Sequence, residues 1–429
     1  MGGGGAGDGT GLREGALMRV AYFLDEFPPF IRGGLGTYAL EMAPRLAAAG
    51  HDLTVYAFRM GNAAVEEEWA GAHVRRLPLP EPAPLLPVVL PSEVAAWPPD
   101  AAHFFADYLF YNIIAAGDLL ARGEGADLAV AHDWLAAPAA MVTAATFGIP
   151  FVFHVHSTEG GRSEGGGSPT VRAIEARALE TAAAVITVSH AMEDELLALG
   201  VPAEKIRVVH NGVDTAKYDP ARIPPAAVRA FRERLGIGCD PLVLFIGRLT
   251  RVKGADTLLR AFGMLLQKVP AAHLLVLGVG EMDGEIRCLA DEVGEGRVHL
   301  EFSFLPEEER ILRYAAADVC VFPSTYEPFG IVCTEAMAMG KPVVVGARGT
   351  SGMREQVVPA GDGICGFHIN PHDPADIATY LSLVLRDSAL RELMGMNGRA
   401  RAVSLFSWDR AARETAAVYE AAARGGKRP

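Results

Sequence analysis

The chain has 429 residues and is 50% hydrophobic, so it is long enough to form two α/β domains, each with its own core. Its formal net charge of −13 argues against nucleic acid or an anionic membrane as the main partner, because both would repel an acidic protein. The five cysteines lack the paired spacing of a metal site, which indicates reduced, buried thiols and a cytoplasmic protein.

The first residues offer little that could form a core. Residues 1–17 are rich in glycine and contain no apolar stretch of signal-peptide length, so we expect a disordered N-terminal extension. A strand pattern begins at Met18. Translation from Met18 is therefore as compatible with the sequence as translation from Met1.

A glycine-rich loop follows the first predicted strand, residues 20–24, and precedes a predicted helix over residues 37–46. This loop contains Arg32, Gly33 and Gly34. Paired glycines at the start of a helix let a substrate approach the backbone closely, and Arg32 adds a cation beside it. The alternative is a glycine turn that binds no ligand.

The next part of the chain combines proline-rich and apolar stretches. Prolines between residues 78 and 99 predict a surface excursion with little regular structure. Residues 128–134 read as a strand that ends in polar side chains, where Asp133 could contact acceptor hydroxyls or cap a helix. The uncharged run 134–153 is broken by glycine and proline, which predicts a buried helix, a turn and a strand instead of a membrane span.

Two histidines lie on a predicted strand within the segment 151–159. Side chains alternate along a strand, so His154 and His156 should share one face, with a buried structural role for one of them. A metal site would need further ligands close by, and the sequence supplies no convincing set. We therefore expect no bound metal.

The second half opens after a linker, residues 216–241, with an apolar strand over residues 242–246. Arg248 and Lys253 follow at the carboxyl end of that strand, where both could reach a diphosphate. The alternative is a charged loop on a solvated face.

The most informative segment starts with an apolar strand at residues 319–322, stops at Pro323 and continues into a helix that ends at Gly340. In an open α/β sheet, ligands bind at the carboxyl ends of the strands, so the loop between strand and helix should face a ligand crevice. The helix would begin with free amides suited to a phosphate anion. These amides belong to Phe329, Gly330 and Ile331.

Two carboxylates flank this expected anion site. Glu327 precedes the helix and Glu335 lies within it. An ionised carboxylate only accepts hydrogen bonds, so each suits a sugar diol and neither suits phosphate. On opposite sides of a diphosphate, one could hold a transferred sugar and the other a ribose. The alternative is that Glu327 is a turn residue and Glu335 a solvated helix residue.

The run Glu-Pro-Phe-Gly-Ile-Val at residues 327–332, followed by Glu-Ala-Met-Ala at 335–338, closely resembles the paired-glutamate signature of retaining glycosyltransferases of family 4. That resemblance implies an α/β protein with the GT-B architecture, in which two Rossmann-like domains face each other across a cleft. It further implies an N-terminal acceptor domain over residues 18–215, a nucleotide-sugar-binding domain over 242–405 and a C-terminal helix, 406–429, that crosses back to the first domain.

The resemblance also implies roles for individual residues. His156 falls where family members carry an active-site histidine, and the spacing of Arg248 and Lys253 matches the family's phosphate-binding pair. The His-Asp-Trp at residues 132–134 and the Gly-Gly-Leu-Gly after Arg32 are similar to motifs of glycogen and starch synthases, in which a lysine stands in place of Arg32. The implied catalytic set is His156, Arg248, Lys253 and Glu327. The implied substrate-binding set is Arg32, Gly33, Gly34, Asp133, Phe329, Gly330, Ile331 and Glu335.

The expected reaction is transfer of a hexose, with glucose as first choice, from a nucleoside diphosphate sugar to a hydroxyl group, with retained anomeric configuration. The expected donor is UDP-glucose or ADP-glucose, no cofactor is needed, and the preferred acceptor is an α-glucan. Alternatives are a small soluble acceptor, a lipid-linked acceptor or a nucleotide-sugar epimerase. No stable association with membranes is expected, and the oligomeric state stays open.

Overall fold

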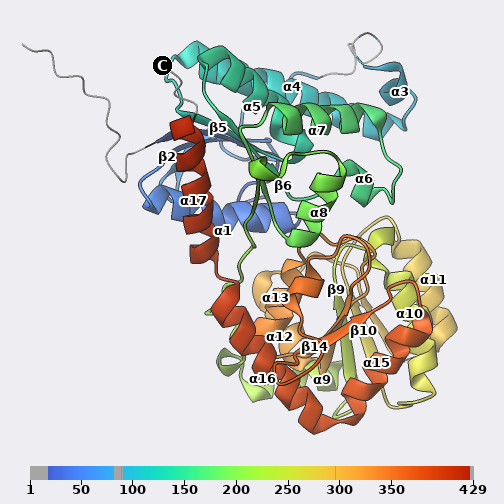
Figure 1. Cartoon of the computed structure of the whole chain (residues 1–429). Coiled ribbons are helices and arrows are strands. Elements are labelled where there is room, and N and C mark those ends of the chain that lie inside the picture. The colour runs from blue at the N-terminus through green and yellow to red at the C-terminus, as the bar shows by residue number, and fades with distance from the viewer. Residues whose placement is uncertain (1–17, 82–87, 89, 295, 426–429) are drawn as a thin grey trace, which may run out of the picture. The chain divides into compact units, whose positions relative to one another are not determined.

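The computed structural model describes residues 18–425 except residues 82–87, 89 and 295 (Figure 1). The predicted disordered extension, residues 1–17, lies outside the described residues. The chain alternates strands and helices over most of its length, as expected for an α/β protein.

The first sheet has eight strands in the order β3-β4-β2-β1-β5-β6-β7-β8. Its strands β1 and β5 are almost entirely apolar and buried, which suits a parallel sheet covered on both faces. The pairs β1–β2, β1–β5, β2–β4 and β7–β8 are parallel, whereas β3 and β4 pair antiparallel at one edge. The strands are β1 (Arg19–Leu24), β2 (Asp52–Ala57), β3 (Glu66–Trp69), β4 (Ala72–Arg75), β5 (Leu128–His132), β6 (Phe151–Val155), β7 (Ala184–Thr187) and β8 (Ile206–Val208).

The second sheet has six strands in the order β11-β10-β9-β12-β13-β14, and all of its pairs are parallel. Counted from β9, this order is 3-2-1-4-5-6, which reverses between β9 and β12. Ligands of such doubly wound sheets bind at the carboxyl ends of the strands beside the reversal. The strands are β9 (Leu242–Ile246), β10 (His273–Leu277), β11 (Val298–Glu301), β12 (Val319–Phe322), β13 (Val343–Gly346) and β14 (Gly366–Ile369).

Helices follow most of the strands. The first part of the chain contributes α1 (Gly34–Ala48), α3 (Ser92–Ala95), α4 (Pro99–Arg122), α5 (Asp133–Phe147), α6 (Glu159–Arg162), α7 (Pro169–Thr181) and α8 (His190–Ala198). The second part contributes α9 (Pro225–Arg234), α10 (Ala255–Leu266), α11 (Asp283–Val293), α12 (Glu307–Ala316), α13 (Ile331–Ala338), α14 (Met353–Gln356), α15 (Pro374–Arg386), α16 (Ser388–Leu405) and α17 (Trp408–Gly425).

The core beside the second sheet explains why these segments form helices. Figure 1 shows α10, α11 and α15 on one side of this sheet and α12 and α13 on the other. Leu258 and Phe262 of α10 and Leu381 of α15 are fully buried against Val243 and Leu274 of the strands. Apolar positions at helical spacing therefore supply the packing that covers the sheet.

By their contacts, the residues form two compact units. One unit comprises Met1–Phe153, Thr181–Ala183 and Ala416–Pro429, and the other comprises His154–Glu180 and Ala184–Thr415. The domain boundaries implied by the family resemblance, 18–215, 216–241, 242–405 and 406–429, stay a prediction.

Strand positions were predicted well, and some boundaries were wrong. The strands expected at 242–246 and 319–322 agree with β9 and β12. The strand expected over residues 128–134 ends at His132, and Asp133 already begins α5. The expected linker contains a helix, α9, whose Arg232 donates hydrogen bonds to the carbonyls of Gly238, Asp240 and Ala316.

The cysteines are all free, but they are not all buried. Cys320, Cys333 and Cys365 are buried as expected, whereas Cys239 and Cys288 are exposed. The expectation of five buried thiols was therefore wrong for two of them, and the cytoplasmic location stays a prediction.

Among the described helices, only α4 has the length and apolar composition of a membrane-spanning helix. Within its most apolar window, 44% of the residues are buried. A buried core helix of a globular protein passes the same test, so α4 alone is weak support for a membrane span.

Candidate functional site

The loop between β12 and α13 has the geometry of an anion site. Gly330 precedes the helix with φ of +88°, a left-handed conformation that glycine adopts without strain. The amides of Phe329, Gly330 and Ile331 donate to no acceptor among the residues that the structure describes. The amino end of α13 therefore presents unused donors and the positive end of its dipole.

Glu327 lies at the centre of this loop and is held by its backbone and its side chain. Its amide donates to the Thr350 carbonyl at 3.0 Å, and its carbonyl accepts from the Gly352 amide at 2.9 Å. The Lys253 ammonium donates to a Glu327 carboxylate oxygen at 2.5 Å. The structure thus joins a predicted sugar-binding carboxylate to a predicted phosphate-binding cation.

The loop after β9 carries both predicted phosphate-binding cations. Lys253 ends a short 3₁₀ turn, and Val252 beside it accepts a hydrogen bond from the Thr325 amide at 2.9 Å. Gly254 follows with φ of +70°, and a Cβ there would lie 2.3 Å from the Pro323 carbonyl oxygen. Because only glycine permits this approach, the loops after β9 and β12 pack directly against each other.

Arg248 differs from Lys253 in its surroundings. Its side chain is exposed and makes no hydrogen bond or ion pair with another described residue. It follows β9, the first strand of the sheet, at the edge where the strand order reverses. A guanidinium in this position can form two parallel hydrogen bonds to a bound anion, that is, bind it in bidentate fashion.

Glu335 lies in a buried polar cluster that the sequence did not reveal. The Tyr218 and Tyr314 hydroxyls each donate to one of its carboxylate oxygens, both at 2.8 Å. Burial, together with the charge of Glu335, raises the pKa of both phenols, so they remain protonated donors at neutral pH. Glu335 is 3% exposed, so the alternative of a solvated helix residue was wrong.

The cluster around Glu335 is completed by a cation. The Arg310 guanidinium donates to the Tyr218 hydroxyl at 3.3 Å, and the charge of Glu335 helps to raise the Arg310 pKa although burial opposes this. A carboxylate oxygen has two lone pairs, so Glu335 keeps acceptor capacity beyond the two phenols. Tyr218 lies 117 residues before Glu335, and no short-range pattern signals that pairing.

His154 lies in β6 and His156 follows its last residue, and the two are arranged as their spacing predicts. Their rings are nearly parallel, with centroids 6.1 Å apart. His154 is 1% exposed, and burial, assisted by His156, lowers its pKa well below the usual range. His154 is therefore a neutral core residue, whereas His156 is only half-buried.

The first unit contains the remaining predicted site residues, Arg32, Gly33, Gly34 and Asp133. The Glu26 carboxylate accepts hydrogen bonds from the Arg32 amide at 2.8 Å and the Gly33 amide at 3.0 Å. These amides are thus already occupied by an anion. A close backbone approach is required at Gly36, where a Cβ would lie 2.7 Å from a Glu26 carboxylate oxygen.

Asp133 and Asp25 form a second feature of the first unit. Asp133 begins α5 with φ of +53°, a conformation that is strained for a residue with a side chain and is frequent at functional sites. Burial raises the pKa of Asp25 to about 7, and the charges of Glu26 and Asp133 add to this shift. Asp25 was not among the predicted site residues, although it directly follows the buried strand β1.

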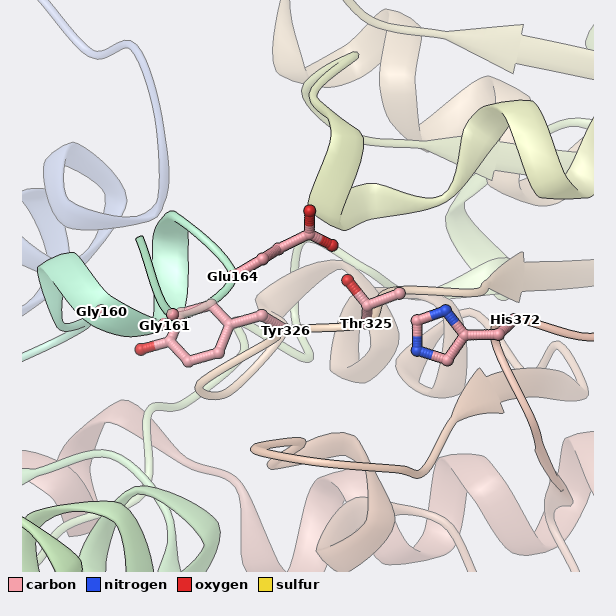
Figure 2. Close-up of a pocket in the computed structure, with 7 residues that line it drawn as sticks. Gly160, Gly161, Glu164, Thr325, Tyr326 and His372 are labelled. Carbon is pink, nitrogen blue, oxygen red and sulfur yellow. The ribbon is translucent and has the colours of Figure 1, made fainter. Parts of the chain in front are cut away.

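A pocket of about 300 Å³ lies within the second unit (Figure 2). It is lined by four residues of the segment 160–165 and by Thr325, Tyr326 and His372. Thr325 and Tyr326 immediately precede Glu327. The pocket therefore lies next to the loop that carries Glu327, Phe329 and Gly330.

One cluster in the second unit has the composition of a metal site. Ligand atoms of His190, His210 and Glu355 all lie within 4.8 Å of one another. Glu355, however, already accepts hydrogen bonds from the His190 amide at 3.0 Å, the Ala191 amide at 2.7 Å and the His210 ring at 3.1 Å. These bonds account for the arrangement, and the expected absence of a metal stays a prediction.

Two family models match the chain in succession. The model described as Glycosyltransferase Family 4 matches residues 32–217, and the model described as Glycosyl transferases group 1 matches residues 228–401. Together they cover every predicted site residue and all strands of the two sheets except β1.

Three relatives are each 31% identical to the chain. An uncharacterized glycosyltransferase from Methanocaldococcus jannaschii aligns over 94% of this chain and 98% of its own length. A glycogen synthase from Mycobacterium tuberculosis aligns over 96% of this chain and 97% of its own length. A D-inositol 3-phosphate glycosyltransferase from Catenulispora acidiphila aligns over 92% of both proteins.

Solved structures show the same fold. Sucrose-phosphate synthase from Thermosynechococcus elongatus has a TM-score of 0.78 and 25% identity over 94% of this chain and 98% of that one. Anabaena HepE in complex with UDP-glucose has a TM-score of 0.72 and 22% identity, over 94% and 100% of the chains. The catalytic domain of Arabidopsis thaliana starch synthase IV, bound to ADP and acarbose, has a TM-score of 0.71 and 19% identity, over 95% and 99%.

Proposed function

Because this chain belongs to the retaining glycosyltransferases of family 4, has the GT-B fold and uses a nucleotide sugar, we propose that it transfers glucose from UDP-glucose or ADP-glucose to a hydroxyl group of an α-glucan. The observation that carries this proposal is the contact between Lys253 and Glu327 beside the unused amides of α13. A cation, a carboxylate and an anion site thereby meet in one loop cluster.

The diphosphate of the donor binds to the positive groups of this cluster. Arg248 and Lys253 supply two charges, and the amides of Phe329, Gly330 and Ile331 supply hydrogen-bond donors at the positive end of a helix dipole. Negative charge develops on the diphosphate as it leaves, and preorganised donors stabilise that charge without a metal ion. Arg248 is the more accessible of the two cations.

The sugar end and the ribose end of the donor bind to different carboxylates. Glu327 accepts hydrogen bonds from hydroxyls of the transferred glucose, and His156 donates a hydrogen bond to the same sugar. Glu335, oriented by Tyr218 and Tyr314, accepts from the ribose hydroxyls with its remaining lone pairs.

The transfer step exchanges one bond at the anomeric carbon. The bond from this carbon to the diphosphate oxygen breaks, and a bond to the acceptor hydroxyl oxygen forms on the same face of the sugar. The proton of that hydroxyl passes to the departing diphosphate, so the products are an α-glucoside and a nucleoside diphosphate. No redox partner is needed.

The α-glucan acceptor is supported by the glycogen synthase relative and by the polar residues of the first unit. We assign acceptor hydroxyls to Asp133 and to the loop with Arg32, Gly33 and Gly34. The D-inositol 3-phosphate glycosyltransferase relative, at the same identity, favours a second candidate: transfer to a small phosphorylated acceptor. A lipid-linked acceptor has no comparable support among the described residues.

A matrix of donors and acceptors tests this proposal. Glucose carried on uridine, adenosine or guanosine diphosphate is offered with maltotriose, glycogen, inositol phosphate, a hexose phosphate or a lipid acceptor. We expect elongation of maltotriose or glycogen with a uridine or adenosine donor. Exclusive transfer to a phosphorylated acceptor would replace the glucan assignment with the second candidate, and conversion of the donor alone into an epimer would contradict transfer.

A further inference from the structure

The pocket beside Glu327 has one wall that is fixed by close packing. A Cβ at Gly161 would lie 2.0 Å from the Tyr326 ring, so only glycine fits at this position. The Thr158 amide donates to the Tyr326 hydroxyl at 3.0 Å, which fixes the orientation of the ring. The pocket therefore exists before any ligand arrives.

Two arginines, Arg162 and Arg172, form contacts that stabilise the segment 160–165. Arg162 donates to the Ser157 hydroxyl at 2.7 Å and forms ion pairs with Glu159 at 3.2 Å and Glu175 at 3.6 Å. Arg172 donates to the Gly165 carbonyl at 2.6 Å. Both guanidinium groups are therefore already engaged by the protein itself.

The side chains that line the pocket are polar and face one another. Figure 2 shows the Glu164 carboxylate and the Thr325 hydroxyl on the same side of the pocket, with the His372 ring beside Thr325. Neither the Glu164 carboxylate nor the His372 ring has a hydrogen bond or ion pair with another described residue, although the Glu164 amide donates to the Gly161 carbonyl at 3.3 Å. Glu164 has φ of +50°, so the backbone holds this side chain in a strained conformation at the pocket.

These groups suit a ligand with many hydroxyls. A carboxylate accepts hydrogen bonds, and an imidazole can both donate and accept. The Thr325 hydroxyl donates to the Val252 carbonyl at 3.4 Å and offers its oxygen as an acceptor. The lining includes a carboxylate and no lysine or arginine, so a phosphate group in this pocket would meet a like charge with no counter-ion. The volume is at the small end for ligand sites and limits the occupant to a small part of an acceptor.

We propose that this pocket is an acceptor subsite in which Glu164, Thr325 and His372 bind a sugar unit of the acceptor, and that Glu164 selects uncharged polyols over phosphorylated ones. The inference rests on the proposed function and makes it more specific. Among the acceptors of the relatives, it favours a neutral glucan over a phosphorylated inositol.

Two substitutions at one position test the subsite. Glu164→Gln keeps the size and removes the charge, and Glu164→Lys reverses the charge. Glu180→Gln serves as the matched control. Glu180 is an exposed glutamate of α7 and is paired with Arg177 at 2.6 Å. KM and kcat are measured with maltotriose and with a hexose phosphate, and hydrolysis of the donor is measured without an acceptor.

We expect Glu164→Gln to raise the KM for maltotriose by about 10-fold, because a hydrogen bond to a charged group is lost. The donor KM and the hydrolysis of the donor should not change, since neither requires this pocket. We expect Glu164→Lys to raise the kcat/KM for the hexose phosphate, relative to maltotriose, by roughly 10-fold or more. Glu180→Gln should behave as the unmodified protein does.

The inference fails if the protein transfers glucose and both Glu164 variants keep its acceptor KM values and its preference. The proposed function survives that result. If the protein transfers glucose from no donor, the proposed function fails. The subsite is then tested separately, by calorimetric measurement of the affinity of maltotriose for the unmodified protein and for Glu164→Gln. Equal affinity of the two proteins for maltotriose would then overturn it, and a weaker affinity of the variant would support it.

Discussion

The Lys253 ammonium lies 2.5 Å from a carboxylate oxygen of Glu327, although 74 residues separate them in the chain. Their side chains are 17% and 11% exposed. A pair this buried is sensitive to the loss of either partner, because the remaining charge is left without compensation. The same contact joins the group expected to hold phosphate to the group expected to hold the transferred sugar.

Substitution of Glu327 should affect turnover more than nucleotide binding. We expect Glu327→Gln to lower kcat by about 30- to 1000-fold, since a charge-assisted contact made in the transition state is worth roughly 2 to 4 kcal/mol. Product inhibition by the nucleoside diphosphate should change little. Glu41→Gln is a matched control, because Glu41 is 10% exposed and paired with Arg45 at 2.7 Å in α1. Unchanged kcat in Glu327→Gln would rule out this role.

Substitutions of Arg248 and Lys253 should have the same effect on nucleotide binding and different effects on the stability of the fold. Arg248→Ala and Lys253→Ala should both weaken inhibition by the nucleoside diphosphate, because each removes a phosphate partner. Only Lys253→Ala should also destabilise the fold, by about 1 to 3 kcal/mol, since it leaves Glu327 unpaired in a partly screened site. Denaturant titration and product inhibition measure the two effects. Equal stability of the two variants would argue against the ion pair.

The tyrosines beside Glu335 should control affinity for the nucleotide. We expect Tyr218→Phe and Tyr314→Phe to raise the donor KM and the product inhibition constant by about 10-fold each, with kcat within about twofold, because Glu335 loses an orienting hydrogen bond. Tyr111→Phe is the control: Tyr111 is buried and donates to the carbonyls of Leu24 and Tyr56. A purely structural cluster would lower stability in all three variants and leave nucleotide affinity unchanged.

Removal of divalent metal should not inactivate the protein. Arg248, Lys253 and the amides of α13 provide the positive groups that a metal would otherwise supply to the diphosphate. We expect activity in excess chelator to stay within about twofold of the untreated value. Inactivation by the chelator, reversed by magnesium or manganese, would contradict this mechanism.

Glu355 should make stability depend on pH. Burial raises its pKa, but hydrogen bonds from His210 and from the amides of His190 and Ala191 outweigh that effect, so the net pKa lies below the ordinary value of 4.5. A carboxyl group whose pKa is lowered by folding stabilises the protein above its unfolded pKa, and the benefit disappears as the pH falls through the folded pKa. Glu355→Gln should therefore lower the denaturation midpoint at pH 7, with the difference shrinking below about pH 4.5. A difference that is constant with pH would show that charge is not involved.

The strands were the most predictable part of the fold. β9 and β12 are continuous apolar runs bounded by polar residues or turns, so composition alone located them. The same reasoning identified Arg248 and Glu327, because polar residues that follow such strands lie at the ligand edge of a parallel sheet. Asp133 was placed at the end of a strand although it begins α5, since the φ of +53° that turns the chain there has no sequence signal.

Pairings between distant segments could not be predicted. Nothing near Glu335 in the sequence indicates that Tyr218 binds it, and nothing near Glu327 indicates that Lys253 pairs with it. These contacts depend on how the loops meet after folding. The burial of Glu335, in contrast, is compatible with its sequence surroundings, because its helix is apolar around most of its circumference and such helices are buried.

The most direct test of the account follows both products of one reaction. The protein is incubated with UDP-glucose or ADP-glucose and maltotriose, and nuclear magnetic resonance reports the anomeric configuration of the new linkage while free nucleoside diphosphate is measured in parallel. We predict a new α-glucosidic bond for each nucleoside diphosphate released, and a much slower reaction with Glu327→Gln. A β-glucosidic product, or nucleotide release without any new glycosidic bond on any acceptor, would contradict the account.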